Sequence, residues 1–561
     1  MCGIFAILNN STIDKTIETS FKSGSGRGPE FSKLVATQKN VTLGFHRLAI
    51  NGLNELSNQP LNVNGVTLIC NGEIYNYKQL YNILDINPTT QSDCEIIIHC
   101  YLKFGIKYTL DILDGVFAFV LIDNKSGEIY VARDIYGVRP LFCSLQEGPD
   151  STKEKEQEQE QYNRIFFASE LKMIHELTTH KICQFRPGSY SKYVFNNSIW
   201  CQEEKYVGYH EGCITQSSAW YYNEIREKLI SSVKKRIDAT ERPIACLLSG
   251  GLDSSLITSI VSSFMDTQGK TVETYSIGLE GSEDLKYARL VANFLNTDHH
   301  EIVVSEDDFL QAIPEVIKII ESYDTTTVRA SVGNYMVAKY IKEHSDAKVI
   351  FNGDGSDEVT GGYMYFHKAP DSLTFDNECK RLLKDICYFD GLRSDRCISC
   401  HGLEARTPFL DKEFVRNYLS LPYQKRYHTG QKQCEKYLLR EAFGSYLPAE
   451  VLFRTKEAFS DGVSNQTRSW YQIIQEHIEE LDLDMSKQYD FNPPQTKEQY
   501  YYRKVFEELY PGRSNVIPYF WMPRFIENAT DSSARTLDIY KQQMTQKNVP
   551  TKNKNNHSMY K

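Results

Sequence analysis

The sequence has no apolar run that approaches the roughly 20 residues needed to cross a bilayer, although 41% of its 561 residues are hydrophobic. It also lacks a positively charged region before the short apolar stretch MCGIFAILNN, which a secretory signal would have. We therefore expect neither a membrane protein nor a secreted one, and we expect it in the cytosol. The 14 cysteines are then expected to be reduced thiols rather than a disulfide framework.

A basic stripe is also missing. The net charge is -10, and the lysines and arginines are scattered along the chain. Nucleic-acid binding proteins gather such residues on one face, so we expect no nucleic-acid partner. Small anionic substrates remain compatible with this composition.

The pattern of apolar runs divides the chain into two large parts. In residues 2–195, short β-rich runs such as GVFAFVLID alternate with turns and predict a largely antiparallel domain. In residues 215–530, apolar strands such as IACLL precede helix-like patterns and predict a parallel sheet, with KVIF as its third strand. Residues 151–164 form a polar insertion, and residues 531–561 form a C-terminal extension whose end we expect to be disordered.

Cys2 is a candidate nucleophile. Removal of Met1 would leave its own α-amine, with a pKa near 8, beside a thiol with a pKa near 8.5, so the amine could act as the general base. A cysteine at the second position could also be incidental.

The same domain contains the groups that hydrolysis of a carboxamide such as glutamine requires. Asn71 and the Gly72 N–H could donate to the developing oxyanion. The planar guanidinium of Arg47 suits a substrate carboxylate, while Glu73 and Asp93 suit an ammonium group. The pattern therefore predicts a glutamine-hydrolysing site.

Two glycine-rich loops in the second part predict a phosphate site. SGGLDSS, residues 249–255, follows an apolar strand but lacks the lysine of a P-loop, and NGDGSDE, residues 352–358, follows another strand. Asp253 and Asp357 could share Mg²⁺ on a leaving pyrophosphate. Each loop taken alone could also be an ordinary turn.

Several motifs occur along the chain in the same order as in a known family, and together they carry a family resemblance. MCGI, RGP, HRLAI, NGEIYN and RDIYGVRPLF resemble the N-terminal-nucleophile glutaminase domain of class II amidotransferases, and SGGLDSS resembles the pyrophosphate loop of ATP pyrophosphatases. TTTVRASVGNY, SCHGLEARTPFLD and FRTKEAFSDG narrow this resemblance to the asparagine synthetase family of eukaryotic type. The resemblance covers the chain from Cys2 to about Lys541.

The resemblance implies an αββα sandwich followed by a parallel-sheet α/β domain. It also implies a ligase that uses ATP with Mg²⁺, L-aspartate and L-glutamine, passes through β-aspartyl-AMP and transfers ammonia between its two sites; a homodimer is left open. The implied site residues are as follows: Cys2, Asn71, Gly72, Asp354 and Lys456 for catalysis; Arg47, Leu48, Ala49, Ile50, Asn51, Asn71, Gly72, Glu73 and Asp93 for glutamine; Leu248, Ser249, Gly250, Gly251, Asp253, Ser254, Ile277, Asn352 and Gly353 for ATP; Arg329 for aspartate; Asp253 and Asp357 for the metal.

Two motifs depart from the family pattern. GRGPE replaces the usual HRGPD and places Glu30 at its end, and NGDGSDE replaces SGEGSDE and so introduces Asn352 and Asp354. An inactive homologue, a relative that adenylates another acid such as a β-lactam synthetase, and a non-catalytic assembly protein therefore remain alternatives. CISCH, residues 397–401, also matches a haem-attachment pattern, and Cys379 and Cys387 lie upstream as alternative metal ligands.

Overall fold

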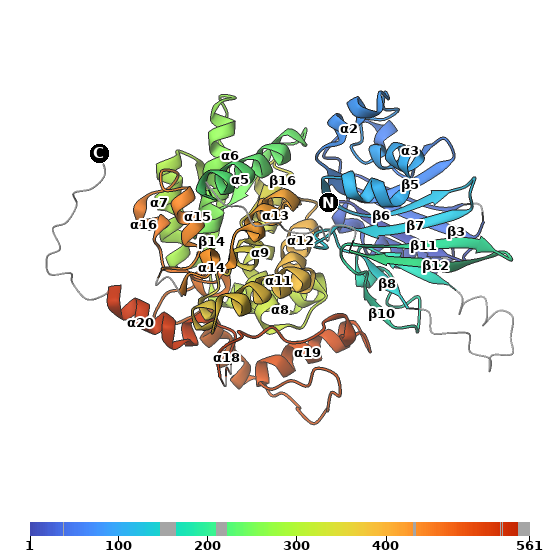
Figure 1. Cartoon of the computed structure of the whole chain (residues 1–561). Coiled ribbons are helices and arrows are strands. Elements are labelled where there is room, and N and C mark those ends of the chain that lie inside the picture. The colour runs from blue at the N-terminus through green and yellow to red at the C-terminus, as the bar shows by residue number, and fades with distance from the viewer. Residues whose placement is uncertain are drawn as a thin grey trace.

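The computed structural model describes residues 1–37, 39–145, 164–208, 221–429, 433–527, 529 and 531–547. The expected polar insertion at residues 151–164 lies outside these residues except for Arg164, and so does the end of the C-terminal extension. Figure 1 shows two domains side by side, with the N-terminal domain in blue to blue-green.

The N-terminal domain contains two six-stranded antiparallel sheets, ordered β10-β8-β9-β1-β3-β2 and β12-β11-β7-β6-β5-β4. Because the second sheet includes β12, this domain reaches Val207, beyond the expected end at residue 195. The strands are β1 (Gly3–Leu8), β2 (Phe31–Thr37), β3 (Val41–Arg47), β4 (Leu61–Val63), β5 (Val66–Ile74), β6 (Gly115–Asp123), β7 (Glu128–Arg133), β8 (Phe142–Ser144), β9 (Ile165–Ala168), β10 (Ile182–Gln184), β11 (Ser189–Asn196) and β12 (Ile199–Val207).

The two sheets pack face to face, and helices cover their outer faces. Alternate residues of β1 point to opposite sides: Ile4 and Ala6 join the core between the sheets, whereas Phe5 and Ile7 pack outward, beside helix α1 (Lys15–Lys22). Helices α2 (Tyr77–Leu84) and α3 (Glu95–Ile112) cover the second sheet. This confirms the αββα sandwich.

The C-terminal domain is built around a five-stranded parallel sheet of order β15-β14-β13-β16-β17. KVIF corresponds to β16 (Val349–Phe351), which is the fourth strand along the domain, so its prediction as the third strand was wrong. The omitted strand, β15 (Asp298–Val304), lies at the sheet edge, and its half-exposed sequence DHHEIVV has no continuous apolar run. The remaining strands are β13 (Ile244–Leu247), β14 (Glu273–Leu279) and β17 (Glu404–Arg406).

Helices surround this sheet (Figure 1). They are α5 (Tyr221–Asp238), α6 (Leu252–Asp266), α7 (Glu283–Leu295), α8 (Glu306–Ile320), α9 (Thr325–His344), α10 (Ser356–Thr360), α11 (Ser372–Asp385), α12 (Asp390–Ser399), α13 (Lys412–Ser420), α14 (Tyr423–Arg426), α15 (Tyr437–Ala442), α16 (Ala449–Leu452), α17 (Phe459–Gly462), α18 (Trp470–Glu480), α19 (Lys497–Leu509) and α20 (Asp538–Lys547). In the part of the chain that is described, no helix is long and apolar enough to span a membrane.

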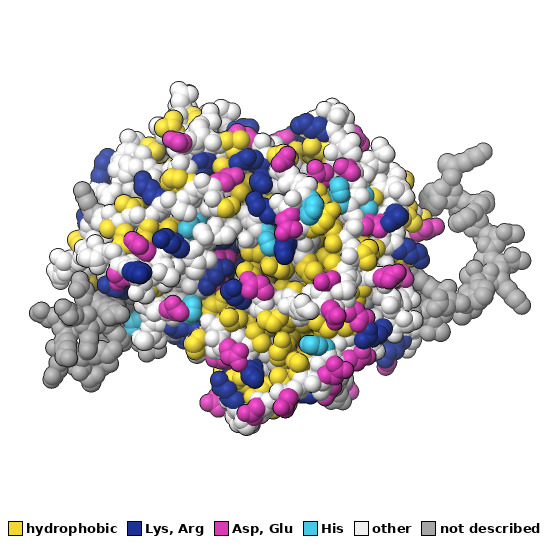
Figure 2. Space-filling model, turned by 180° about the vertical axis from the view of Figure 1, so that it is seen from behind, with side chains coloured by type: hydrophobic (Ala, Val, Ile, Leu, Met, Phe, Trp, Pro, Cys, Tyr) yellow, Lys and Arg dark blue, Asp and Glu magenta, His cyan; other side chains and the backbone are white. Residues whose placement is uncertain are grey.

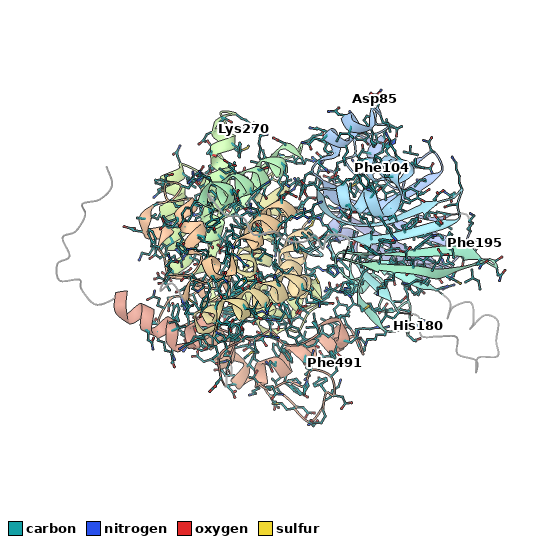
Figure 3. The ribbon with its side chains drawn as sticks, viewed as in Figure 1. Asp85, Phe104, His180, Phe195, Lys270 and Phe491 are labelled. Atoms are coloured by element: carbon teal, nitrogen blue, oxygen red, sulfur yellow. The ribbon has the colours of Figure 1, made fainter. Side chains whose placement is uncertain are left out.

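Buried polar contacts join the two domains. Arg27 donates to Asp395 on α12 at 2.6 and 3.1 Å. Near the lower edge of the interface, Arg513 donates to the backbone oxygens of His175 and His180, at 2.7 and 2.6 Å; His180 is labelled in Figure 3. On the face shown in Figure 2, charged groups of both signs are interspersed.

Candidate active sites

Cys2 immediately precedes β1 and lies at the domain interface. Its Sγ is 3.6 Å from the Leu48 oxygen, and its own backbone oxygen accepts a hydrogen bond from Arg27 Nε at 2.8 Å. Burial raises the pKa of the Cys2 thiol to about 11. Met1 is in place and fully buried, and its ammonium group donates to the Leu403 oxygen at 3.0 Å. The nitrogen of Cys2 is therefore an amide here, and its role as a general base stays a prediction.

Asn71 and Gly72 lie on β5. Asn71 is fully buried, and neither its Nδ2 nor its Oδ1 has a hydrogen-bond partner among the described residues. A side chain at Gly72 would come within 2.6 Å of the Val116 oxygen, so only glycine fits. A buried amide without a partner is costly. Donation to a substrate oxyanion would satisfy it.

Glu73 and Asp93 form a buried acidic pair in the same domain. Glu73 accepts a hydrogen bond from Asn51 Nδ2 at 2.7 Å, and Asp93 accepts one from the Ile74 N–H at 2.7 Å. Burial, reinforced by the charge of Asp93, raises the pKa of Glu73, and burial raises that of Asp93 to about 6. A cation between them, such as an α-ammonium group, would relieve this repulsion.

Arg47 organises the predicted glutamine loop, residues 48–51. Its Nη1 donates to the Asn54 oxygen at 2.9 Å and to Asn58 Oδ1 at 2.7 Å, and its Nη2 donates to the Gly52 oxygen. These bonds fold the chain from residue 51 to residue 58 around the guanidinium. Direct contact of Arg47 with the glutamine carboxylate stays a prediction.

The second site is a cavity where the parallel strands β13, β14 and β16 end, as expected for this class of sheet. Gly250 does not line it. Its φ of +70° makes the turn, and a side chain there would meet Ala288 N at 2.4 Å on α7. The predicted ATP residues that do line the cavity are Leu248, Ser249, Gly251, Asp253, Ser254, Ile277, Asn352 and Gly353.

Two lysines join the carboxylates of the two glycine-rich loops. Lys436 Nζ is 2.6 Å from both Asp253 Oδ2 and Asp357 Oδ1, and Lys456 Nζ is 2.7 Å from Asp357 Oδ2. Although burial opposes its charge, these ammonium groups lower the pKa of Asp253 to about 2. Lys436 was not predicted from the sequence, because it stands in the polar segment QKQCEKY, where no motif marks it.

These carboxylates also bear on the predicted metal. No cluster of three or more metal-ligating side chains occurs in the described ranges. Two carboxylates completed by phosphate oxygens of a nucleotide would nevertheless form the donor set that Mg²⁺ prefers, so the chemistry of Asp253 and Asp357 is compatible with the predicted ion.

Asp354 also lines the cavity and pairs with Arg393 Nη2 at 2.8 Å. Burial raises the pKa of this carboxyl group, although Arg393 opposes the shift. Asn352 fixes the loop, because its Oδ1 accepts from the Asp354 N–H at 3.3 Å and its Nδ2 donates to Ser394 on α12 at 2.7 Å. The two residues that depart from the family pattern are thus hydrogen-bonded to each other.

Arg329 does not line the cavity. Its guanidinium makes bidentate pairs with Glu498, at 2.8 and 2.6 Å, and with Asp531, at 2.8 Å for both bonds. The two carboxylates occupy four of its donor positions, so the geometry gives the predicted contact with aspartate no support. Arg393 does line the cavity, where it pairs with Asp354 at 2.8 Å and with Asp390 at 3.4 Å.

The C-terminal extension packs onto the segment that carries Lys456. Arg535 Nη2 donates to Glu457 Oε2 at 2.8 Å, Tyr540 OH also donates to Glu457, and Ser533 Oγ donates to Asp461 at 2.7 Å. The extension therefore covers the segment that contributes Lys456 to the cavity and holds it by hydrogen bonds.

Arg535→Ala is expected to slow, by about tenfold, the ammonium-dependent synthesis that the resemblance implies, because a buried charged hydrogen bond that holds the Lys456 segment is lost. Glutaminase activity should stay unchanged. Arg468→Ala is the matched control, since Arg468 forms an exposed pair with Glu476. Equal losses in both activities of Arg535→Ala would contradict a local role.

Comparison with known proteins agrees with this two-site architecture. The glutamine amidotransferase domain family matches residues 1–205, and the asparagine synthase family matches residues 224–378 and 370–524. Asparagine synthetase [glutamine-hydrolyzing] of Gallus gallus is 41% identical over 576 residues, covering 96% of this chain and 99% of the relative. The Homo sapiens relative of the same name is 40% identical over 576 residues, with the same shares of 96% and 99%.

Among solved structures, the glutamine phosphoribosylpyrophosphate amidotransferase from B. subtilis is 20% identical, with a TM-score of 0.30, and the match covers 49% of this chain and 66% of that one. This match is too partial to carry an argument. The two family matches and the full-length relatives carry it, and the chain belongs to the glutamine-hydrolysing asparagine synthetase family.

Proposed function

We propose that this protein converts ATP, L-aspartate, L-glutamine and water into AMP, diphosphate, L-asparagine and L-glutamate in the cytosol. One observation carries the proposal: the same chain contains a cavity whose two carboxylates are bridged by lysines and, on strand β5 with Glu73, a buried Asn71 whose side chain has no hydrogen-bond partner among the described residues. Phosphate chemistry and amide hydrolysis therefore have separate sites.

In the N-terminal domain, the Cys2 sulfur attacks the side-chain carboxamide of glutamine. Asn71 Nδ2 and the Gly72 N–H stabilise the oxyanion, and expulsion of ammonia leaves a thioester. Water then hydrolyses the thioester to glutamate. Glu73 and Asp93 hold the substrate α-ammonium group during both steps.

In the C-terminal domain, the β-carboxylate of aspartate attacks the α-phosphorus of ATP, and diphosphate leaves. Lys436 and Lys456 stabilise the negative charge that develops on the leaving group. Mg²⁺ held by Asp253 and Asp357 would supply further charge neutralisation on the phosphates. Ammonia then displaces AMP from the activated carbonyl and forms asparagine.

The test is to identify the products made from ATP and aspartate with either glutamine or ammonium chloride. We expect one AMP and one diphosphate for each asparagine with both nitrogen donors. Formation of ADP and phosphate would overturn adenylation. Glutamate without asparagine would show that only the glutaminase half works.

Asp354→Glu is expected to lower aspartate-dependent ATP/diphosphate exchange about tenfold, because the longer acid must fit a loop already fixed by Asn352 and Arg393. This exchange isolates adenylate formation from ammonia transfer. A faster exchange would show that the natural aspartate is too short. Exchange unchanged in both Asp354→Glu and Asp354→Ala would remove this residue from the chemistry.

A further inference from the structure

The loop predicted to bind glutamine, residues 48–51, and the adjoining Gly52 are hydrogen-bonded to the C-terminal domain. The segment that contacts it, Ala239 to Arg242, lies between α5 and β13. Glu241 accepts a hydrogen bond from the Gly52 N–H at 2.8 Å, and its own N–H donates to the Ile50 oxygen at 3.1 Å. Asn51 Nδ2 donates to the Ala239 oxygen at 3.1 Å. The loop thus has partners in both domains.

Arg242 contacts both the backbone of the loop and the side chain of Glu30. Its Nε donates to the Ala49 oxygen at 2.8 Å, and its Nη2 donates to Glu30 Oε1 at 2.8 Å. The other oxygen of Glu30 accepts from the Ala49 N–H at 2.6 Å. Both backbone groups of Ala49 are therefore satisfied by one ion pair that crosses the domain boundary.

This arrangement acts close to the reacting groups. Ala49 follows Leu48, whose oxygen is 3.6 Å from Cys2 Sγ. Asn51, two residues further on, donates to Glu73 at 2.7 Å. A displacement of the Ala49 backbone would move the residues on both sides, which contact the nucleophile and the acidic pair.

We propose that Arg242, together with Glu30, is a positioning residue for glutamine binding, so that the glutaminase site is completed by the neighbouring domain. The inference rests on the proposed function. It also gives Glu30 a role in this chain, because its carboxylate must reach both the Ala49 N–H and Arg242. Neither residue takes part in the chemistry at the thiol.

The bonds to Ala49 stabilise the position of the loop more than the ion pair between Arg242 and Glu30 does. The side chains of Arg242 and Glu30 are 27% and 31% exposed, and pairs exposed to this extent contribute little by themselves. A charge-assisted bond to a loop backbone contributes more, because its loss leaves the loop free to move. We therefore expect a change in glutamine affinity of about tenfold rather than a loss of activity.

The experiment measures kcat and KM for glutamine, and the ammonium-dependent rate, in wild type, Arg242→Ala, Arg242→Lys and Glu30→Ala. Arg242→Ala is expected to raise the KM for glutamine about tenfold, with kcat and the ammonium-dependent rate within about twofold of wild type. Arg242→Lys, which keeps the charge, should recover part of the affinity. Arg468→Ala, an exposed arginine elsewhere in the domain, should change neither parameter.

A double variant shows whether Arg242 and Glu30 act together or independently on the KM for glutamine. If Arg242 and Glu30 act as one unit, Arg242→Ala combined with Glu30→Ala should raise KM no further than either change alone. An unchanged KM in folded Arg242→Ala or Glu30→Ala overturns the proposal, and so does an equal loss of the ammonium-dependent rate. Absence of asparagine synthesis in the wild type would instead reject the proposed function.

Discussion

Cys2→Ala is expected to reduce glutamine-dependent asparagine synthesis below detection while ammonium-dependent synthesis continues at the wild-type rate. The substitution removes the sulfur that we propose attacks the carboxamide; this sulfur lies 3.6 Å from the Leu48 oxygen. The C-terminal cavity contains none of the altered atoms. The measurement is asparagine formed with each nitrogen donor at saturating ATP and aspartate.

The matched control for this prediction is Cys201→Ala, which removes an exposed thiol from the same domain and should leave both activities unchanged. If Cys2→Ala abolishes both activities, the two sites are not separable. If it abolishes neither, Cys2 is not the nucleophile.

Removal of Met1 is expected to be necessary for Cys2 to act as the nucleophile, and mass spectrometry of the intact protein can check whether Met1 is present. With Met1 in place the pKa of the Cys2 thiol is about 11, so only about one thiol in 10⁴ is ionised at pH 7. Burial lowers the pKa of the Met1 amine to about 5, and this amine is bonded to Leu403 rather than to the thiol. We expect active enzyme to have lost Met1, because only then does Cys2 have its own amine as a base.

The sequence was sufficient to predict most of the architecture, and most of the residues predicted to bind ATP line one cavity. Short β-rich runs separated by turns indicated the antiparallel domain, and apolar strands each followed by a helix-like pattern indicated the parallel one. Strand β15 was not predicted, because its position at the sheet edge leaves it half exposed and its sequence without a continuous apolar run. Gly250 does not line the cavity, and its φ of +70° and close approach to α7 account for the glycine; its predicted contact with ATP stays a prediction.

The residues that were missed depend on partners far away in the chain. Lys436 meets Asp253 across 183 residues, and Arg242 meets Glu30 across 212. Arg329, in contrast, was predicted from its motif to contact aspartate; its guanidinium pairs with Glu498 and Asp531, and the predicted contact stays a prediction. A local pattern can identify a charged side chain, but it cannot show which opposite charge the fold brings to it.

Lys436→Ala is expected to lower aspartate-dependent ATP/diphosphate exchange by about 10²- to 10³-fold, while the glutaminase activity remains. Lys436 is almost fully buried and is the only described cation within 3 Å of both Asp253 and Asp357. Its removal leaves two carboxylates facing each other with less compensation, and breaking a buried pair in this way costs about 3–5 kcal/mol.

The loss should exceed that of Lys456→Ala, because Lys456 approaches Asp357 at 2.7 Å but Asp253 only at 3.6 Å. Lys436→Arg keeps the charge, but Gly362 packs against the lysine stem, where even an added methyl carbon would lie 1.9 Å from its Cε, so the larger guanidinium has no room. We therefore expect Lys436→Arg to rescue little of the exchange. If the exchange falls less in Lys436→Ala than in Lys456→Ala, the bridge between the two loops holds the fold rather than the leaving diphosphate. Raising Mg²⁺ should then restore none of the rate, whereas it should restore part of it if Lys436 neutralises phosphate charge.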